Sequence, residues 1–355
     1  MTSSNMTRRR FFQGAGALGA ALLPGWSSPA SPSRASGAQE GLTTGPSQTA
    51  SGRPFFLSTW KHGKPANEKA AEVLAGGGSL MDAIEKGINI PELDPEVMSV
   101  GYGAIPNEEG VLQLDAVIMD GATHRAGAVA ALEMIPTPIS VARRVMEKTR
   151  HTLLAGAGAL QFALQEGFEP QQLLTPKALE RWEKWRQNPK RQSYWRKDAP
   201  VSRLKEWPLE EHVGDTITLA ALDGKGNLAA GGSTSGLSWK LSGRVGDVPL
   251  LGCGIFVNND AGAAGATGDG DEMQKFSTSA TIVERMRQGM HPQAACESVL
   301  RWILEVNPVN KDIEACVYAV NKKGEFGACS IRPKEFTYAV WMPGVSELRT
   351  APSIL

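Results

Sequence analysis

Alternating and helically spaced apolar positions divide the chain into two groups of elements on either side of a charged middle. In the first group, apolar and β-branched runs predict a strand over 54–60 and three short strands over 99–132. Apolar residues at helical spacing predict two helices joined by three glycines over 67–90, and single helices over 140–149 and 158–167. The first half therefore mixes strands and helices.

The second group repeats this mixture from residue 216 onward. Strands are predicted over TITLAAL (216–222), NLAAGGSTSG (227–236), LLGCGIFVNN (250–259), ACVYAVN (315–321), FGACSI (326–331) and FTYAVWM (336–342). Helices are predicted over 275–289 and 291–306. Because strands and helices are grouped and do not alternate strictly, the order predicts an α+β fold of antiparallel sheets with helices packed outside. We expect a single domain over 54–355.

The middle, residues 168–213, joins the two groups. Its tryptophans are interleaved with basic residues, a pattern that also occurs on nucleic-acid-binding surfaces. The excess of positive charge is small and local, however, so PKALERWEKWRQ (176–187) is predicted to be a solvated helix followed by a surface linker. We expect no nucleic-acid partner, in keeping with the equal totals of 37 Lys and Arg and 37 Asp and Glu.

The N-terminus predicts a targeting segment. TRRRFFQG (7–14), a short apolar run and then Ser, Pro and Ala form an export signal over 1–39 that resembles the twin-arginine type and implies a periplasmic destination. A basic tail without this role is the alternative. Residues 40–53 are expected to be a disordered linker. No segment has 18 uninterrupted apolar residues, so no transmembrane helix is expected.

The cysteines indicate neither a redox motif nor a metal site. Cys253, Cys296, Cys316 and Cys329 form no CxxC pair, and the five histidines are scattered, so zinc is not expected. EACVYAVNKKGEFGACS predicts a hairpin that places Cys316 opposite Cys329, which allows a disulfide in an exported protein; free core thiols are the alternative.

Thr216, at the start of the second group, is the candidate nucleophile. It follows Asp215 directly, and the segment before it is charged. If the bond before Thr216 is cut, the freed α-amine titrates at about pH 8, close to ideal for activating the hydroxyl of the same residue. Thr216 as a simple β-former is the alternative, because an Asp-Thr pair before a strand is not specific.

The Gly-dense residues after this strand supply groups for binding an amino acid. Arg244 and Asp247 in GRVGD lie three residues apart, and a cation beside an anion suits the α-carboxylate and α-ammonium of such a substrate. A local salt bridge between the two is the alternative. ATGDG (266–270) can present backbone N–H groups in a tight turn to an oxyanion.

Taken together, GDTITLAALDGKGNLAAGGSTSG, GRVGD and GATGDGDE resemble the glycosylasparaginases (aspartylglucosaminidases), N-terminal-nucleophile hydrolases of the asparaginase type 2 superfamily. Upstream, FLSTWKHGKPANEKA, GGGSLMDAIEKG, DPEVMSVGYGAIP, LDAVIMD and ISVARRVMEKT are similar as well, so the resemblance covers roughly residues 54–340. It implies a four-layer αββα sandwich, made as one precursor that cuts itself between Asp215 and Thr216 into an α chain and a β chain. It also implies an (αβ)2 assembly and no metal or organic cofactor.

The resemblance further implies a reaction, the release of L-aspartate and a glycosylamine from N4-(β-N-acetylglucosaminyl)-L-asparagine, with Thr216 as nucleophile. The other implied roles are the following: Thr234 and Ser99 orient Thr216, Arg244 and Asp247 hold the substrate, Thr267 and Gly268 form the oxyanion hole, and Trp60 lines the pocket.

Two departures from the family pattern bear on this function. The usual His-Asp-Thr cleavage motif is here Gly214-Asp215-Thr216, with the nearest histidine at His212, which bears on the efficiency of self-cleavage. ATGDGDE replaces the frequent ATGHGE and places Asp269 near the site, which bears on sugar-side specificity. An isoaspartyl peptidase or L-asparaginase on the same fold, and an unprocessed exported amino-acid-binding protein, are the alternative functions.

Overall fold

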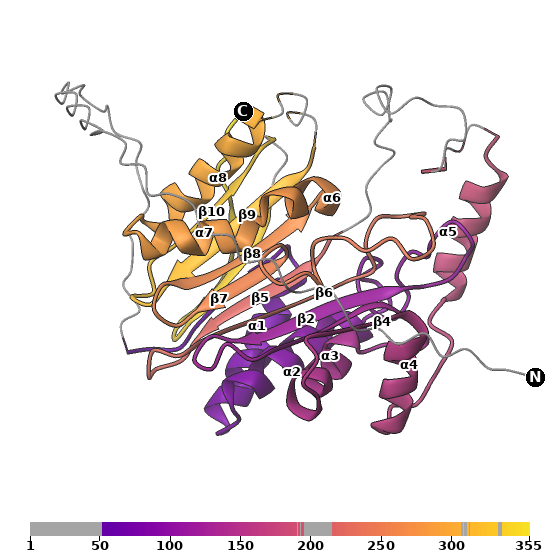
Figure 1. The fold of residues 1–355 in the computed structure, drawn as a ribbon, viewed down its shortest axis with the longest axis horizontal. Helices are drawn as coiled ribbons and strands as arrows, with labels where there is room; N and C mark the ends of the chain where they lie inside the picture. Colours follow the sequence, from indigo (N-terminus) through magenta and orange to yellow (C-terminus); the bar gives the residue numbers. More distant parts are fainter. Residues whose placement is uncertain are drawn as a thin grey trace, which may run out of the picture. The chain divides into compact units, whose positions relative to one another are not determined.

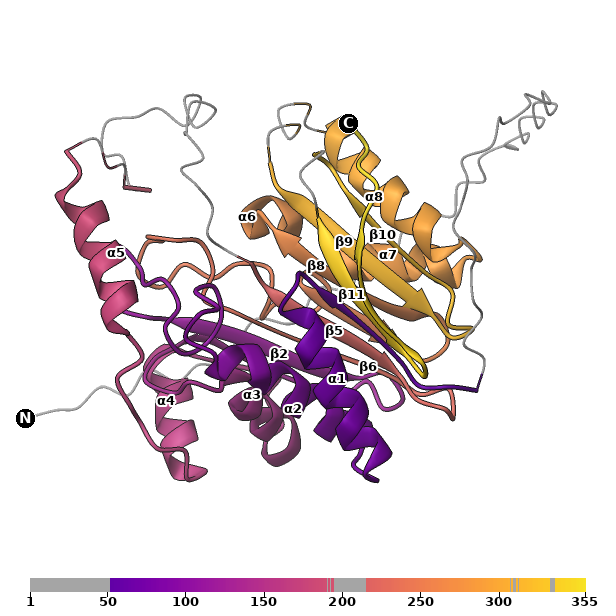
Figure 2. The ribbon, with the colours of Figure 1, turned by 180° about the vertical axis from the view of Figure 1, so that it is seen from behind.

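The chain builds two β-sheets that face each other and carry helices on their outer faces, a four-layer αββα sandwich (Figures 1 and 2). The structure is a computed structural model, and it describes residues 52–189, 191, 193–194, 215–306, 308, 311, 313–332 and 336–355. The expected α+β class and layered architecture are confirmed.

The larger sheet contains eight strands in the order β12-β11-β1-β5-β6-β2-β3-β4, all antiparallel to their neighbours except the β3–β4 pair. Its strands are β1 (Phe55–Thr59), β2 (Leu114–Asp120), β3 (Ala126–Leu132), β4 (Leu153–Ala155), β5 (Ile217–Leu222), β6 (Leu228–Thr234), β11 (Thr337–Met342) and β12 (Val345–Thr350). The smaller sheet, in the order β10-β9-β8-β7, is antiparallel throughout. It consists of β7 (Ile255–Asn258), β8 (Gly262–Gly268), β9 (Ala315–Asn321) and β10 (Phe326–Ser330).

Two sets of helices cover the outer faces. Against the larger sheet lie α1 (Gly63–Ala75), α2 (Leu80–Leu93), α3 (Pro138–Lys148) and α4 (Gly156–Gln165). Against the smaller sheet lie α7 (Thr278–Arg287) and α8 (Pro292–Val306). The short α6 (Gly270–Met273) and the 3-10 turn η2 (Gln274–Phe276) follow β8. The predicted helices in these regions are thereby confirmed.

The apolar alternation of β5 shows how the layers are held together. Ile217, Leu219 and Ala221 pack into the core beneath α1 and α2, whereas Ala220 and Leu222 pack into the core between the two sheets. Every residue of β5 is buried, as expected of a central strand with a layer on each face. A third core joins the smaller sheet to α7 and α8. This packing fixes the position of Thr216, the residue directly before β5.

The strand order interleaves the two halves of the chain. In the larger sheet, β5 lies between β1 and β6, and β6 pairs on its other side with β2. Strands from before and after residue 215 are therefore neighbours, so two chains cut at that point would still share one sheet.

Some predicted strands differ from the structure. The first of the three strands expected over 99–132 is absent: residues 99–113 form a loop, in which Gly101 adopts a φ of +60° and lies so close to α2 that a Cβ atom would sit 2.1 Å from the Glu92 carbonyl oxygen. Strands β4, β8 and β12 were not predicted. β8 is rich in Gly and Ala because Tyr318 packs closely on it, 2.5 Å from where a Cβ of Gly265 would be.

Of the two alternatives for Cys316 and Cys329, the structure shows thiols in the core and no disulfide. The predicted hairpin exists, but its register pairs Cys316 with Ser330 and Cys329 with Val317, one residue away from the expected pairing. Because a shift of one residue reverses the face of a strand, Cys316 packs between the sheets and Cys329 packs under α8. All four cysteines are buried, and none of them is part of a disulfide.

The helix predicted in the charged middle is partly buried, whereas a solvated helix was predicted. The expected helix is α5 (Pro176–Gln187), but Trp185 is buried and stacks on Trp239 with ring centroids 5.0 Å apart, while Arg186 lies over the ring of Trp182.

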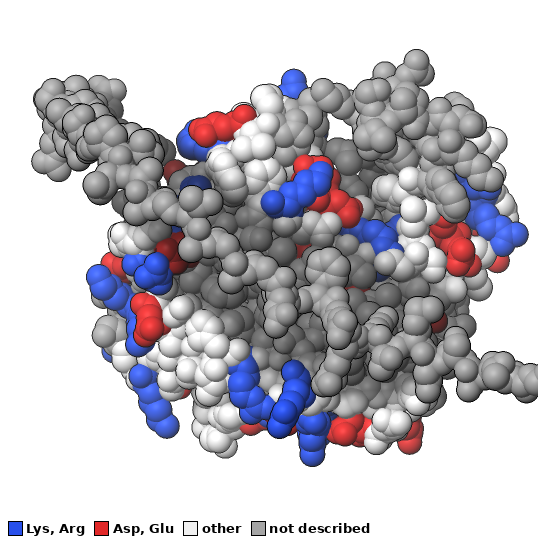
Figure 3. Space-filling model, in the orientation of Figure 1, with Lys and Arg blue, Asp and Glu red and all other residues white. Residues whose placement is uncertain are grey.

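On the face shown in Figure 3, the described Lys and Arg residues are interspersed with Asp and Glu. No helix among the described residues is long and apolar enough to span a membrane. Residues 1–51 and 195–214, including the export signal, most of the linker, His212 and Gly214, lie outside the described residues.

Candidate active site

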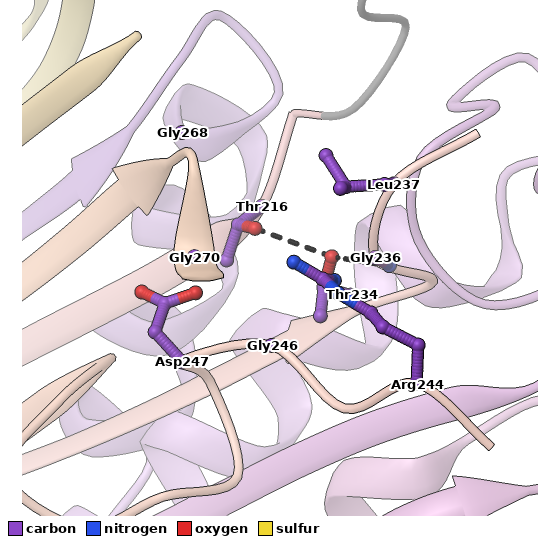
Figure 4. A pocket seen from close by; sticks show the side chains of 9 residues that line it. All are labelled: Thr216, Thr234, Gly236, Leu237, Arg244, Gly246, Asp247, Gly268 and Gly270. Carbon is purple, nitrogen blue, oxygen red and sulfur yellow. Dashed lines mark hydrogen bonds between the residues drawn. The ribbon is translucent and has the colours of Figure 1, made fainter. Parts of the chain in front are cut away.

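Thr216 and Thr234 lie side by side where β5 begins and β6 ends. The register that pairs Ile217 with Ser233 places the two threonines opposite each other, and the Thr216 hydroxyl donates a hydrogen bond of 3.2 Å to Oγ1 of Thr234 (Figure 4). Thr234 Oγ1 also accepts from the Gly236 backbone N–H at 3.0 Å. Thr216 is only 5% exposed, so its hydroxyl is held in a largely desolvated setting.

A pocket opens in front of this pair. Its walls come from the residue before β5, the end of β6, the β6–β7 loop, the end of β8 and the start of α6: Thr216, Thr234, Gly236, Leu237, Arg244, Gly246, Asp247, Gly268 and Gly270. Five sequence-predicted site residues, Thr216, Thr234, Arg244, Asp247 and Gly268, are among them.

Arg244 does not form the local salt bridge with Asp247 that its spacing allowed. Its Nε and Nη2 atoms instead bind the Asp271 carboxylate at 3.1 and 2.7 Å, a two-bond contact. Burial disfavours the charge on Arg244, but the neighbouring carboxylates, Asp271 foremost, together outweigh this effect, so the pKa of Arg244 is raised. Nη1 remains on the pocket side, where a Cβ on Gly246 would lie 2.8 Å from it. The position of Arg244 therefore suits a carboxylate entering the pocket.

Asp247 is the complementary anion. It is 4% exposed, and its Oδ2 atom has no hydrogen-bond partner among the described residues. Burial raises the pKa of Asp247 to about 6, against the opposing effect of Arg244. Gly270 lies against the carboxylate, since a Cβ there would be 2.5 Å from Oδ1. A buried carboxylate that keeps one unpaired oxygen and faces a pocket is suited to receive a cation such as an ammonium group.

Behind the pocket wall lies a buried ion pair that the sequence analysis did not single out. Lys240 Nζ is 3.7 Å from Oδ2 of Asp115, and both side chains are almost completely buried. Nζ also donates to the Gln113 carbonyl at 3.1 Å. Burial lowers the pKa of Lys240, with Asp115 acting in the opposite direction. Asp115 lies opposite Thr234 in the β2–β6 register, so this pair supports the strand that carries Thr234.

The candidate oxyanion group lies on β8. Thr267 is fully buried, and its hydroxyl accepts a 3.0 Å hydrogen bond from Nε1 of Trp60, while the next residue, Gly268, lines the pocket. A tight turn was expected for ATGDG, but the stretch is the end of β8 followed by α6. Trp60 contacts the site through Thr267 and is not among the residues that line the pocket.

The remaining sequence candidates lie around the pocket. The Ser99 carbonyl accepts bonds from the Ser235 backbone N–H at 2.8 Å and the Ser235 hydroxyl at 3.1 Å, so Ser99 supports the residue after Thr234. Asp215 directly precedes Thr216, as the cleavage prediction requires. Asp269 caps α6 through the Glu272 backbone N–H, and burial raises its pKa.

Comparison with known proteins gives consistent relatives. The family model described as asparaginase matches residues 59–343. The chain is 44% identical over 294 residues to an N(4)-(β-N-acetylglucosaminyl)-L-asparaginase of Elizabethkingia miricola, covering 81% of each chain. The proteins of the same name from Rattus norvegicus and Mus musculus are 38% and 36% identical, covering 81% of this chain and 87% of each relative.

Proposed function

Because this chain belongs to the asparaginase family, and within it to the glycosylasparaginases of the N-terminal-nucleophile type, we propose that it is a self-processing amidohydrolase. Its substrate is N4-(β-N-acetylglucosaminyl)-L-asparagine, and Thr216 is the nucleophile. The observation that carries the proposal is the pocket itself, in which the Thr216 hydroxyl, bonded to Thr234, faces a space bordered by Arg244 and Asp247.

Self-cleavage is the first step of the proposed chemistry. The Thr216 hydroxyl attacks the Asp215 carbonyl carbon, and the acyl group moves from nitrogen to oxygen to give an ester. The C–N bond breaks in this shift, which frees the Thr216 α-amine. Water then hydrolyses the ester, which leaves a carboxylate on Asp215 and regenerates the Thr216 hydroxyl. That amine, with an ordinary pKa of about 8, then serves as the base for its own hydroxyl.

Turnover uses the same hydroxyl. Thr216 Oγ1 attacks the side-chain carbonyl of the substrate while the α-amine takes up the proton. Collapse of the tetrahedral intermediate breaks the amide bond, and the departing glycosylamine receives a proton. Water then hydrolyses the β-aspartyl ester and releases L-aspartate. Thr267 and Gly268 at the end of β8 are the proposed donors to the oxyanion.

Recognition of the amino-acid part relies on Arg244 and Asp247. Arg244 holds the α-carboxylate through the part of its guanidinium that Asp271 does not occupy, and Asp247 holds the α-ammonium. A free α-amine and a free α-carboxylate are therefore both required. Blocking either group on the substrate is expected to raise KM strongly. No group in these steps requires a metal or an organic cofactor.

The substrate is tested by measuring kcat/KM for glycosylated asparagine, a β-aspartyl dipeptide and L-asparagine side by side. All three substrates present the same aspartyl part to Arg244 and Asp247, so differences in kcat/KM among them report on the leaving group alone. The proposal predicts the highest value for glycosylated asparagine. If that substrate is the poorest of the three, the chain is an isoaspartyl peptidase or L-asparaginase on the same fold.

An unprocessed amino-acid-binding protein is the second candidate function, favoured by the Gly214-Asp215-Thr216 sequence in place of the usual His-Asp-Thr. It predicts an intact chain that binds L-aspartate and turns nothing over. Any catalysis by the wild-type protein excludes it.

We also propose that the cut chains pair as (αβ)2 and that the protein is exported. Support for pairing comes from exposed apolar side chains on β4 and α4, Leu153 at 39% and Leu164 at 44%. Light scattering after size exclusion distinguishes one αβ unit from two. Support for export comes from TRRRFFQG. Replacing Arg8, Arg9 and Arg10 with Lys is expected to abolish its appearance in the periplasm, and continued export would refute the twin-arginine route.

A further inference from the structure

A hydroxyl on β1 lies directly against the backbone of the candidate nucleophile. Thr59 Oγ1 donates a 2.5 Å hydrogen bond to the Thr216 carbonyl oxygen and accepts a 2.9 Å hydrogen bond from the Thr218 backbone N–H. Main-chain pairing of β1 with β5 ends at Ser58 and Leu219, so this side chain bonds the two backbone groups beyond the paired region. Thr59 is fully buried.

The next residue connects to the other sheet. Trp60 adopts a φ of +59°, a conformation that is uncommon for a bulky residue, and its ring donates to Thr267 on β8 at 3.0 Å. Two consecutive residues thus contact the two parts of the site: Thr59 holds the start of β5 in the larger sheet, and Trp60 holds the end of β8 in the smaller one.

We propose that Thr59 is a positioning residue for Thr216, both in self-cleavage and in turnover. The inference rests on the proposed function. The Thr216 side chain is held through Thr234, and its carbonyl is held through Thr59, so two anchors fix one residue. Once the α-amine is free, the Thr59 contact holds the backbone of the new terminal residue. Attack requires a defined approach to the carbonyl carbon, and small displacements of a nucleophile cost large factors in rate.

The loss of this anchor is expected to affect rate more than binding. Arg244 and Asp247 belong to the β6–β7 loop and make no hydrogen bond with Thr59 among the described residues. Thr59→Val keeps the shape of the side chain but removes both hydrogen bonds. We expect self-cleavage and kcat each to fall between about tenfold and about a hundredfold, with KM unchanged within about twofold.

Two further variants separate positioning from general destabilisation. Thr59→Ser keeps the hydroxyl and is expected to restore most of both rates. Ser58→Ala removes a buried hydroxyl from the neighbouring residue of the same strand, whose Oγ has no hydrogen-bond partner among the described residues, and is expected to match wild type. If Thr59→Val does not fold, the rates of Thr59→Cys and Thr59→Ser can be compared instead. The two side chains are similar in size, but the thiol is only a weak hydrogen-bonding group.

The experiment measures self-cleavage by denaturing gel and kcat and KM at 25 °C on the folded, cut fraction of each full-length variant. Slower cleavage and lower kcat at constant KM, restored by Ser, support the inference. Wild-type rates in Thr59→Val, or equal losses in Thr59→Ser, overturn it, as does a lowered melting temperature with no change in rate. An inactive wild-type protein would instead overturn the proposed function, so the two failures are distinguishable.

Discussion

Asp247 gives the binding of amino acids a pH dependence whose sign and size follow from its burial. The pKa of this carboxyl is raised to about 6, so it is ionised above that pH and neutral below it. A neutral carboxyl does not pair with the α-ammonium of the ligand. Affinity for L-aspartate is therefore expected to be complete above pH 7 and to be lost as the pH falls through about 6.

The magnitude follows from the ionised fraction. A group with a pKa of about 6 is roughly 90% ionised at pH 7 and roughly 10% ionised at pH 5, so the inhibition constant of L-aspartate is expected to rise about tenfold over this range. L-Aspartate is a suitable probe because its own side-chain carboxyl, with an ordinary pKa of about 3.9, stays largely ionised throughout.

The assay is competitive inhibition by L-aspartate between pH 5 and 7.5, with three variants beside the wild type. Asp247→Asn is expected to bind weakly and without the step near pH 6. Asp269→Asn is expected to move the step to lower pH, because the negative charge of Asp269 helps to raise the pKa of Asp247. Asp260→Asn, at an exposed position in the β7–β8 turn, is the matched control and should retain the wild-type profile. A flat wild-type profile down to pH 5, or an unchanged step in Asp247→Asn, would refute the assignment.

Three further predictions concern ionisable side chains. Asp271→Asn removes the charged partner of Arg244 and should raise KM by about tenfold, with kcat nearly unchanged; a fall in kcat alone would contradict this. Lys240→Met leaves Asp115 buried without its ion-pair partner and should lower the free energy of unfolding by about 3–5 kcal/mol. The double variant Lys240→Met/Asp115→Asn should recover part of this loss in denaturant titrations. If the losses of the two single variants simply add in the double variant, the two residues are not paired. Burial raises the pKa of Glu92 to about 8, so the folded state keeps this carboxyl protonated where the unfolded chain ionises it, and stability should fall from pH 5 to pH 8. In thermal melts, Glu92→Gln should reduce the fall in stability between pH 5 and pH 8. If the stability of Glu92→Gln falls with pH as steeply as that of wild type, Glu92 is not the source of the fall.

The sequence predicted those parts of the fold in which apolar periodicity is strong. The strongly apolar strands β1, β5 and β9 and the amphipathic helices α3 and α8 lie where the pattern placed them. β8 was missed because its Gly and Ala residues carry little apolar signal. These residues must be small because Tyr318 of β9 packs closely against them, and this contact between distant residues cannot be inferred from the local sequence. The Cys316–Cys329 pairing failed for a similar reason, since register is set by the whole hairpin and an error of one residue reverses the face.

The candidate site shows the same division. Thr216, Arg244 and Asp247 were recognisable from residue type and spacing, and Thr234 from the family resemblance. The structure brings all four around one pocket. The partner of Arg244 was not predictable, because the choice between Asp247 and Asp271 depends on how α6 approaches the β6–β7 loop.

Thr59 and the Lys240–Asp115 pair were also missed as parts of the site. Each acts on a residue distant in sequence: Thr59 on β5, and Asp115 beside Thr234 on the neighbouring strand. The available signals were weak. Thr59 stands beside Trp60 in LSTW, and Asp115 is an acid in the otherwise apolar start of LDAVIMD, where a buried charge implies a partner.

The central claim is that Thr216 becomes an N-terminal residue by self-cleavage. Intact mass of the purified protein under denaturing conditions, with N-terminal sequencing of each fragment, tests it most directly. The account predicts two chains, one of which begins Thr-Ile-Thr-Leu. A single uncut chain that remains intact over days, or a fragment that begins at another residue, would contradict it.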